Sequence, residues 1–75
     1  MELNKFIEKF REVLEIESVE ELGGDTLFHQ LEEWSSLTGL LVIGMVLDEY
    51  GKDLKADVIR KCETIEDLFN AVKAI

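Results

Sequence analysis

Apolar residues recur at helical spacing in the first part of the chain. They lie one, three or four positions apart and fall on one face of a helix, while charged residues fill the opposite face. This pattern predicts a helix from about Glu2 to about Glu15, with a structural role. Its apolar positions are Leu3, Phe6, Ile7, Phe10, Val13 and Leu14.

The stretch from Ile16 to Ser35 loses this periodicity. The run Gly23-Gly24-Asp25-Thr26 breaks any helix. The stretch still carries several apolar residues, so we expect a long loop that packs across the fold, and long loops of this kind are often functional. A short helical turn is expected around Ser18 to Leu22 or Leu27 to Leu31, and Trp34 is expected to anchor the loop on the helices.

The most apolar stretch, Leu37 to Leu47, follows directly after two serines. It predicts a helix that begins at Ser36 and ends at Tyr50, with Gly51 in the left-handed conformation behind it. Two apolar stripes run along this helix. The first contains Val42, Val46 and Tyr50, and the second contains Leu37, Leu40, Leu41 and Gly44. Because a domain of this size cannot surround a helix on all sides, we expect part of the second stripe to be exposed.

Two further helices complete the prediction. A short one spans about Ala56 to Lys61, and Thr64 with Asp67 forms a capping-box pair that opens the last helix. Proline is absent and helix-forming residues dominate. We therefore expect an all-α fold, a single domain over residues 1–75. It would be a small four-helix bundle with three main helices, one short helix and a long loop between the first two.

Composition narrows the classes of partner. A net charge of −9 argues against binding nucleic acid and favours encounters with basic partners. The single cysteine, Cys62, excludes an internal disulfide and a multi-cysteine zinc site, and it fits a reducing cytoplasm. No apolar run approaches the ~20 residues that span a bilayer, and the first residues do not form a signal peptide. We expect a cytoplasmic monomer that binds no membrane.

The sequence offers no catalytic constellation, so we do not expect an enzyme. His29 has Cys62 as its sole candidate partner for metal binding or nucleophilic chemistry, and each is expected to be ordinary: a surface imidazole and a small, largely buried hydrophobe. The paired acids Glu20-Glu21 and Glu32-Glu33 are expected to be solvated charges. No metal site is predicted.

Ser36 stands where the loop meets the apolar helix, and its position supports two interpretations. A serine there can cap the helix, because its hydroxyl accepts a hydrogen bond from a free backbone N–H. It can equally carry a phosphate, because the start of a helix has partial positive charge and free donors.

The ordered features of nearly the whole chain resemble those of acyl carrier proteins and related phosphopantetheine-bearing carrier domains. The matching segments are Trp34-Ser35-Ser36-Leu37-Thr38, Asp48-Glu49-Tyr50-Gly51 and Glu63-Thr64-Ile65-Glu66-Asp67-Leu68. The resemblance implies a 4′-phosphopantetheine arm, donated by coenzyme A through a phosphopantetheinyl transferase and attached to the Ser36 hydroxyl. Alignment of Leu37 with the leucine of the family's Asp-Ser-Leu pattern selects Ser36 over Ser35. The arm's thiol would then carry an acyl or aminoacyl group as a thioester between acyl-loading and acyl-processing enzymes.

The chain departs from the family pattern at two places. Ser35 stands where the family usually has aspartate, and the early part of the apolar helix is poor in acids. If the family's docking role carries over, partner enzymes would contact four residues with more apolar area than usual: Leu37, Leu40, Leu41 and Asp48. This favours a specialised biosynthetic pathway over central fatty-acid synthesis. The alternative is a degenerate carrier fold that acts only in protein–protein interaction.

Overall fold

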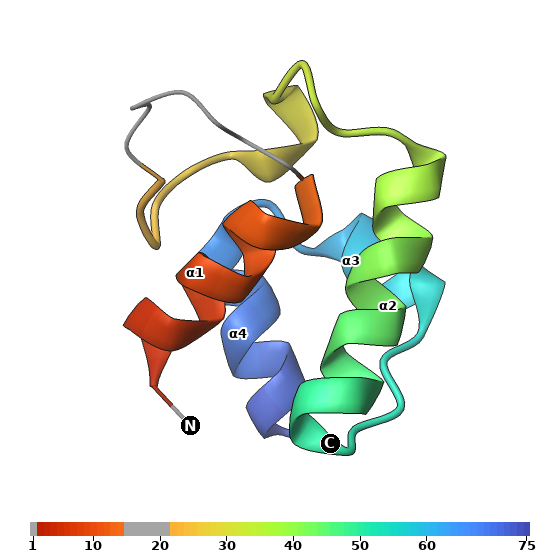
Figure 1. Cartoon of the computed structure of the whole chain (residues 1–75). Coiled ribbons are helices and arrows are strands. Elements are labelled where there is room, and N and C mark those ends of the chain that lie inside the picture. The colour runs from red at the N-terminus through yellow and green to blue at the C-terminus, as the bar shows by residue number, and fades with distance from the viewer. Residues whose placement is uncertain (1, 15–21) are drawn as a thin grey trace.

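The computed structural model describes residues 2–14 and 22–75 of the chain (Figure 1). Four α-helices form the described part: α1 (Leu3–Leu14), α2 (Ser36–Tyr50), α3 (Ala56–Lys61) and α4 (Ile65–Lys73). A single 3₁₀ turn, η1 (Phe28–Gln30), precedes α2. Figure 1 shows α1 and α2 at the front on opposite sides, with α4 behind and between them and α3 behind α2. The predicted all-α class, with three longer helices and one short helix, is confirmed.

Most of the helix boundaries predicted from the sequence agree with the structure. Helix α2 starts and ends at the predicted residues, and Gly51 behind it has φ 64°, in the left-handed region. Helix α3 also has the predicted bounds, and α4 opens with the predicted capping box between Thr64 and Asp67. In this box the Thr64 hydroxyl accepts a hydrogen bond from the Asp67 N–H at 3.0 Å, and the Asp67 carboxylate accepts one from the Thr64 N–H at 3.2 Å.

The segment between α1 and α2 is described only in part. The helical turn expected around Leu27 to Leu31 is confirmed by η1. Glu15, the expected end of the first helix, lies outside the described residues, and of the turn expected from Ser18 to Leu22 only Leu22 is described. The first part of the predicted long loop is therefore not tested. Its later part is irregular apart from η1, as expected.

Aromatic side chains make up the centre of the core. Phe6, Phe10 and Phe28 are fully buried, and Phe10 meets Phe28 edge-on with ring centroids 5.7 Å apart. Trp34 stacks on Phe10 at 6.0 Å with nearly parallel rings, so it anchors the loop as predicted. The other buried core residues are Leu14, Val42, Met45, Val46, Leu54, Ile59, Cys62, Ile65, Leu68, Phe69 and Val72. This packing fixes the loop against the helices immediately before α2 begins.

Backbone hydrogen bonds hold the same loop to the start of α4. The first N–H groups of an α-helix have no partner within the helix, so they need an external acceptor. Here the Ile65 N–H donates to the Thr26 carbonyl at 3.1 Å, and the Glu66 N–H donates to the Gly24 carbonyl at 2.8 Å. The loop thereby supplies acceptors to the first turn of α4 and is held against it.

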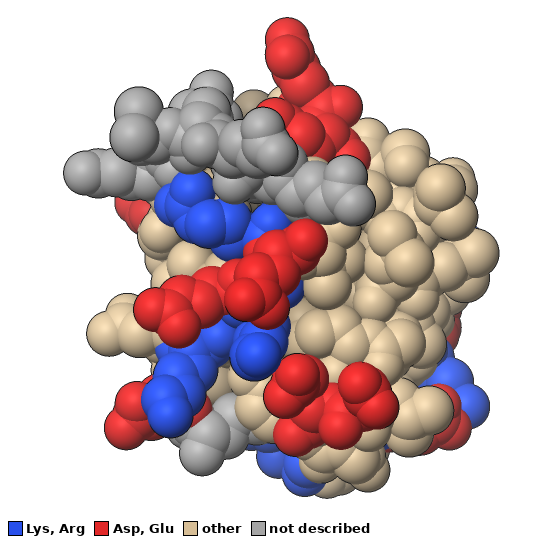
Figure 2. Space-filling model, viewed as in Figure 1, with Lys and Arg blue, Asp and Glu red and all other residues tan. Residues whose placement is uncertain are grey.

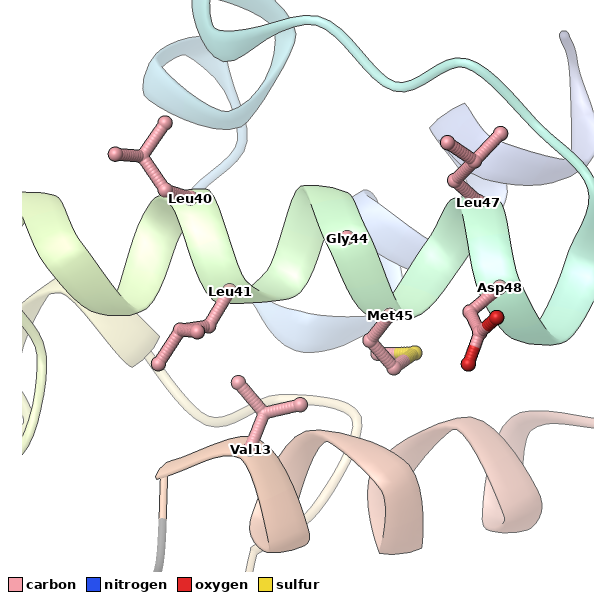
Figure 3. A pocket seen from close by; sticks show the side chains of 7 residues that line it. All are labelled: Val13, Leu40, Leu41, Gly44, Met45, Leu47 and Asp48. Carbon is pink, nitrogen blue, oxygen red and sulfur yellow. The ribbon is translucent and has the colours of Figure 1, made fainter.

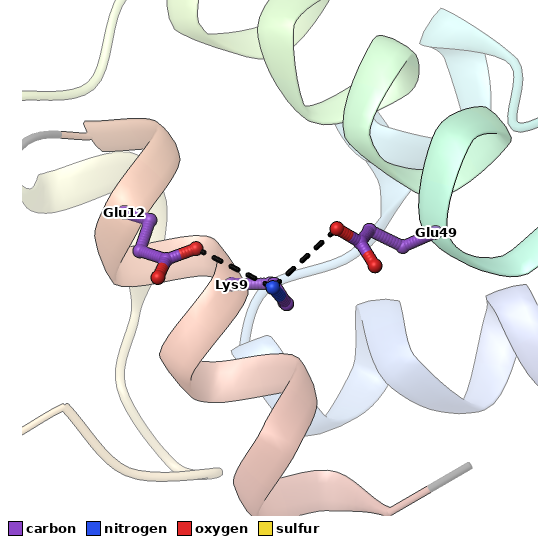
Figure 4. Close-up of polar contacts among 3 residues, drawn as sticks. All are labelled: Lys9, Glu12 and Glu49. Carbon is purple, nitrogen blue, oxygen red and sulfur yellow. Dashed lines mark ion pairs between the residues drawn. The ribbon is translucent and has the colours of Figure 1, made fainter.

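An ion-pair network joins α1 to α2 on the surface (Figure 4). Lys9 Nζ lies 3.4 Å from a Glu49 carboxylate oxygen and 3.7 Å from one of Glu12. The hydrogen bond to Glu49, with the charge of Glu12, raises the pKa of Lys9 above its ordinary value. Because these side chains are solvated, we expect the network to contribute little to stability.

Candidate functional site

Ser35, not Ser36, caps helix α2. Ser35 has extended backbone angles (φ −153°, ψ 176°), and its hydroxyl accepts a hydrogen bond from the Thr38 N–H at 3.4 Å. The Thr38 hydroxyl accepts a hydrogen bond from the Ser35 N–H at 2.6 Å and donates one to the Ser35 carbonyl at 2.7 Å. The interpretation of Ser36 as the cap is therefore wrong. A capping side chain belongs to the extended residue before the helix, and Ser36 is already the first helical residue.

Because Ser35 caps the helix, the Ser36 hydroxyl is not used in capping and is available for modification. Its side chain is exposed, and its hydroxyl forms no hydrogen bond with any described residue. The first turn of α2 contains no acidic residue, so no carboxylate of that turn offsets the partial positive charge of the helix start. A phosphate ester at Ser36 would be stabilised there by roughly 0.3–1 kcal/mol.

A groove of about 450 Å³ begins at Ser36 and runs between α2 and α3. Its walls are mostly apolar, with Arg60 as the one permanently charged side chain that lines it. The lining residues are His29, Trp34, Ser35, Ser36, Gly39, Leu40, Ile43, Ala56, Ile59 and Arg60. The groove is open to solvent and is adjacent to the proposed attachment point, so a flexible chain tethered to Ser36 has an apolar surface within reach.

Four leucines of α2 are exposed, on more than one side of the helix (Figure 3). Their exposed fractions are 65% for Leu37, 63% for Leu40, 48% for Leu41 and 58% for Leu47. The predicted exposure of the second stripe is confirmed, while its predicted role in docking is not tested by these values. Figure 2 shows the corresponding uncharged surface over α2, with acidic side chains over α1 and at the far end of α2.

A second groove, of about 620 Å³ and open to solvent, lies along the exposed side of α2, with Val13 of α1 at its edge (Figure 3). Leu41 and Met45 of α2 point across it toward Val13 of α1, while Leu40 and Leu47 lie on the other side of the helix. Asp48, exposed, lines the end of this groove. Of the four predicted docking residues, Leu40 lines both grooves, Leu41 and Asp48 line this one, and Leu37 lines neither.

His29 and Cys62 are neighbours, but not as a reactive pair. His29 Nε2 lies 3.0 Å from the Cys62 carbonyl oxygen and 3.1 Å from that of Ile59. Because a carbonyl can only accept, Nε2 carries the hydrogen and donates it to the end of α3. The Cys62 side chain is buried, as predicted, and burial raises the pKa of its thiol, which disfavours the nucleophilic thiolate. The imidazole, although exposed, thus serves to hold the loop.

Only one of the two predicted acid pairs, Glu32-Glu33, lies in the described part of the chain. Glu32 is exposed and Glu33 partly so, and the described ion pairs include neither. Glu20 and Glu21 lie outside the described residues. In the part of the chain that the structure describes, no three His, Cys, Asp or Glu side chains gather as metal ligands would. No helix in that part is both long enough and apolar enough to cross a membrane.

Sequence reasoning missed the wall of the groove that faces Ser36. Ile59 and Arg60 lie on α3, far along the chain from Ser36, and Ile43 lies two turns further along α2. The sequence predicted the short helix from about Ala56 to Lys61. Nothing in the pattern indicated which helix it would face.

No family model, no curated protein and no solved structure matches the chain. The resemblance to carrier domains therefore rests on the residues themselves.

Proposed function

We propose that the protein is a carrier that holds acyl or aminoacyl groups as thioesters on a 4′-phosphopantetheine arm attached to Ser36. The observation that supports this proposal most directly is the exposed Ser36 hydroxyl at the start of α2, which has no hydrogen-bond partner among the described residues. The resemblance of the surrounding sequence to carrier domains supplies the identity of the arm. The protein would shuttle its cargo between cytoplasmic enzymes and would catalyse no reaction itself.

The surroundings of Ser36 support this proposal in two ways. A transferase can reach a side chain that projects from the first turn of a helix, because no described side chain occupies its hydroxyl. The groove between α2 and α3 offers an apolar wall, including Trp34 and Ile43, along which an arm and its cargo can lie. Both features suit a group that is attached, shielded and then presented to a partner.

The direct test is modification by coenzyme A and a promiscuous phosphopantetheinyl transferase, followed by intact mass measurement. We expect a gain equal to one phosphopantetheine on the wild type and on Ser35→Ala, and none on Ser36→Ala. Ser35→Ala is the matched control, since it removes the neighbouring hydroxyl. A gain on Ser36→Ala but not on Ser35→Ala would move the site to Ser35, and no gain with any transferase would refute the proposal.

The predicted docking surface can be tested in the same reaction. Leu37 and Leu41 are exposed near Ser36, and burying a leucine against a partner contributes ~1.5–3 kcal/mol. We expect Leu37→Ser and Leu41→Ser to raise the transferase KM about tenfold. Ile75→Ser is the control, because this side chain is comparably exposed but follows α4 and lines neither groove. Equal effects of all three changes would contradict a local docking surface.

The alternative function is a carrier-like fold that acts only by binding another protein. The observation in its favour is the set of four exposed leucines on α2, a helix that begins directly after Ser35, which replaces the usual aspartate. This alternative predicts that a partner, once identified, binds wild type and Ser36→Ala equally well and that protein isolated from its host has the unmodified mass. A modified Ser36 in the isolated protein would exclude it.

A further inference from the structure

Arg60 gives the groove beside Ser36 a charge that the rest of its wall lacks. The other lining residues are apolar, small or hydroxyl-bearing, apart from His29, whose Nε2 already donates to the end of α3. Arg60 projects from α3, across the groove from α2. A ligand in this groove therefore meets an apolar surface and one guanidinium group.

This guanidinium has no acidic partner among the described residues. Arg60 is exposed, and the ion pairs in that part of the chain are made by Lys9 and Lys55 instead. Other cations of the described chain also form no ion pair, and Arg60 differs from them because it lines the groove that begins at Ser36. A guanidinium in this situation can form two parallel hydrogen bonds to a carboxylate or a phosphate supplied from outside.

We propose that Arg60 is a specificity-determining residue that makes the groove prefer ligands with an anionic group on an otherwise uncharged body. The identity of those ligands rests on the proposed carrier function. Under that function the anion has two sources, the phosphate of the arm and a free carboxylate at the end of the cargo. The guanidinium recognises the same chemistry in both.

Free ligands test this without any modification of Ser36. ¹⁵N-labelled, unmodified protein is titrated at low salt with two pairs of compounds, and the Gly39 and Ile43 amide shifts are followed. The first pair is 4′-phosphopantetheine and pantetheine, which differ by the phosphate. The second is succinyl-pantetheine and butyryl-pantetheine, which have the same number of acyl carbons and differ by the terminal carboxylate.

We expect the anionic member of at least one pair to bind roughly two- to five-fold more tightly, as a solvated ion pair provides. A preference within the first pair identifies the arm's phosphate as the anion, and one within the second identifies the cargo's carboxylate. Arg60→Gln should abolish the preference. Lys61→Gln should keep it, because Lys61 is the adjacent cation on α3 and does not line the groove.

Three results would overturn the proposal: no preference in either pair, a preference that survives Arg60→Gln, or one lost equally in Lys61→Gln, which would indicate bulk charge. These outcomes are separable from the fate of the proposed function. The mass measurement on Ser36 decides whether the protein is modified, and the titration decides whether Arg60 selects anions. Either can fail while the other succeeds.

Discussion

Replacing Ser35 and replacing Ser36 should affect two different properties of this protein. Ser35 caps α2 through one exposed hydrogen bond of 3.4 Å, whereas the Ser36 hydroxyl has no partner among the described residues. Loss of a serine cap costs about 0.5–2 kcal/mol in general. Because the bond here is long and solvated, we expect Ser35→Ala to lower the free energy of unfolding by about 0.5–1 kcal/mol.

The assay is thermal and urea unfolding at pH 7, followed by far-UV circular dichroism. In a domain of this size 1 kcal/mol changes Tm by about 4–8 °C, so Ser35→Ala should lower Tm by about 2–8 °C. Ser36→Ala should leave Tm unchanged or raise it slightly, since alanine is the better helix former at an exposed position. In the modification assay the effects should be reversed: Ser35→Ala should still be modified, and Ser36→Ala should not.

Ser35→Asp sharpens the comparison. Aspartate caps as well as serine and adds a negative charge at the positive end of the helix, so its stability should equal or exceed that of the wild type. Equal losses of Tm in Ser35→Ala and Ser36→Ala would refute the assignment of the cap to Ser35. So would an Ser35→Asp variant as unstable as Ser35→Ala.

Three further changes test the fold around the site. Gly51→Ala should lower the free energy of unfolding in urea by about 1–2 kcal/mol, because the φ of 64° at this position disfavours a side chain. Gly44→Ala, within α2, should raise it by about 0.5–1 kcal/mol, because nothing lies within 4 Å of the added Cβ. Changes of stability in the same direction would contradict the backbone assignment. Asp67→Ala should be less stable than the wild type in urea unfolding at pH 7, because it removes the carboxylate of the capping box that opens α4. Hydrogen bonds from the backbone N–H groups of residues 64 and 63 lower the pKa of Asp67, so this difference should shrink as pH falls below about 4 and the carboxylate protonates. A difference independent of pH would exclude this cause. Lys9→Gln should lower stability only slightly, because the ion pair with Glu49 is solvated. An effect that 1 M NaCl leaves unchanged would show that this pair is not its source.

The helices were predictable because their determinants are local. The capping box that opens α4 joins Thr64 to Asp67 within one turn, and Gly51 ends α2 through its own backbone preference. The apolar spacing of α1 similarly needs no information from the rest of the chain. In each case the residues that decide the structure lie within a few positions of one another.

The cap of α2 shows where local reasoning reached its limit. Two adjacent serines satisfy the same compositional rule for a helix start, and one interpretation of the sequence made Ser36 the cap. Alignment with the family pattern chose between them only as attachment sites. The structure separates them by backbone angle, because Ser35 is extended and Ser36 is helical. Directly before the cap, Trp34 stacks on Phe10 of α1, a contact between distant parts of the chain that local sequence does not show.

The sequence by itself determined the all-α class, most helix boundaries and the presence of a serine where an apolar helix begins. Helical periodicity and capping depend on residues close together in the chain, so they can be predicted from the sequence. Only the tertiary structure decided that the Ser36 hydroxyl has no hydrogen-bond partner among the described residues and that Arg60 shares a groove with Ser36. The shared groove depends on the packing of α3 against α2, which is set by the whole buried core rather than by any single segment.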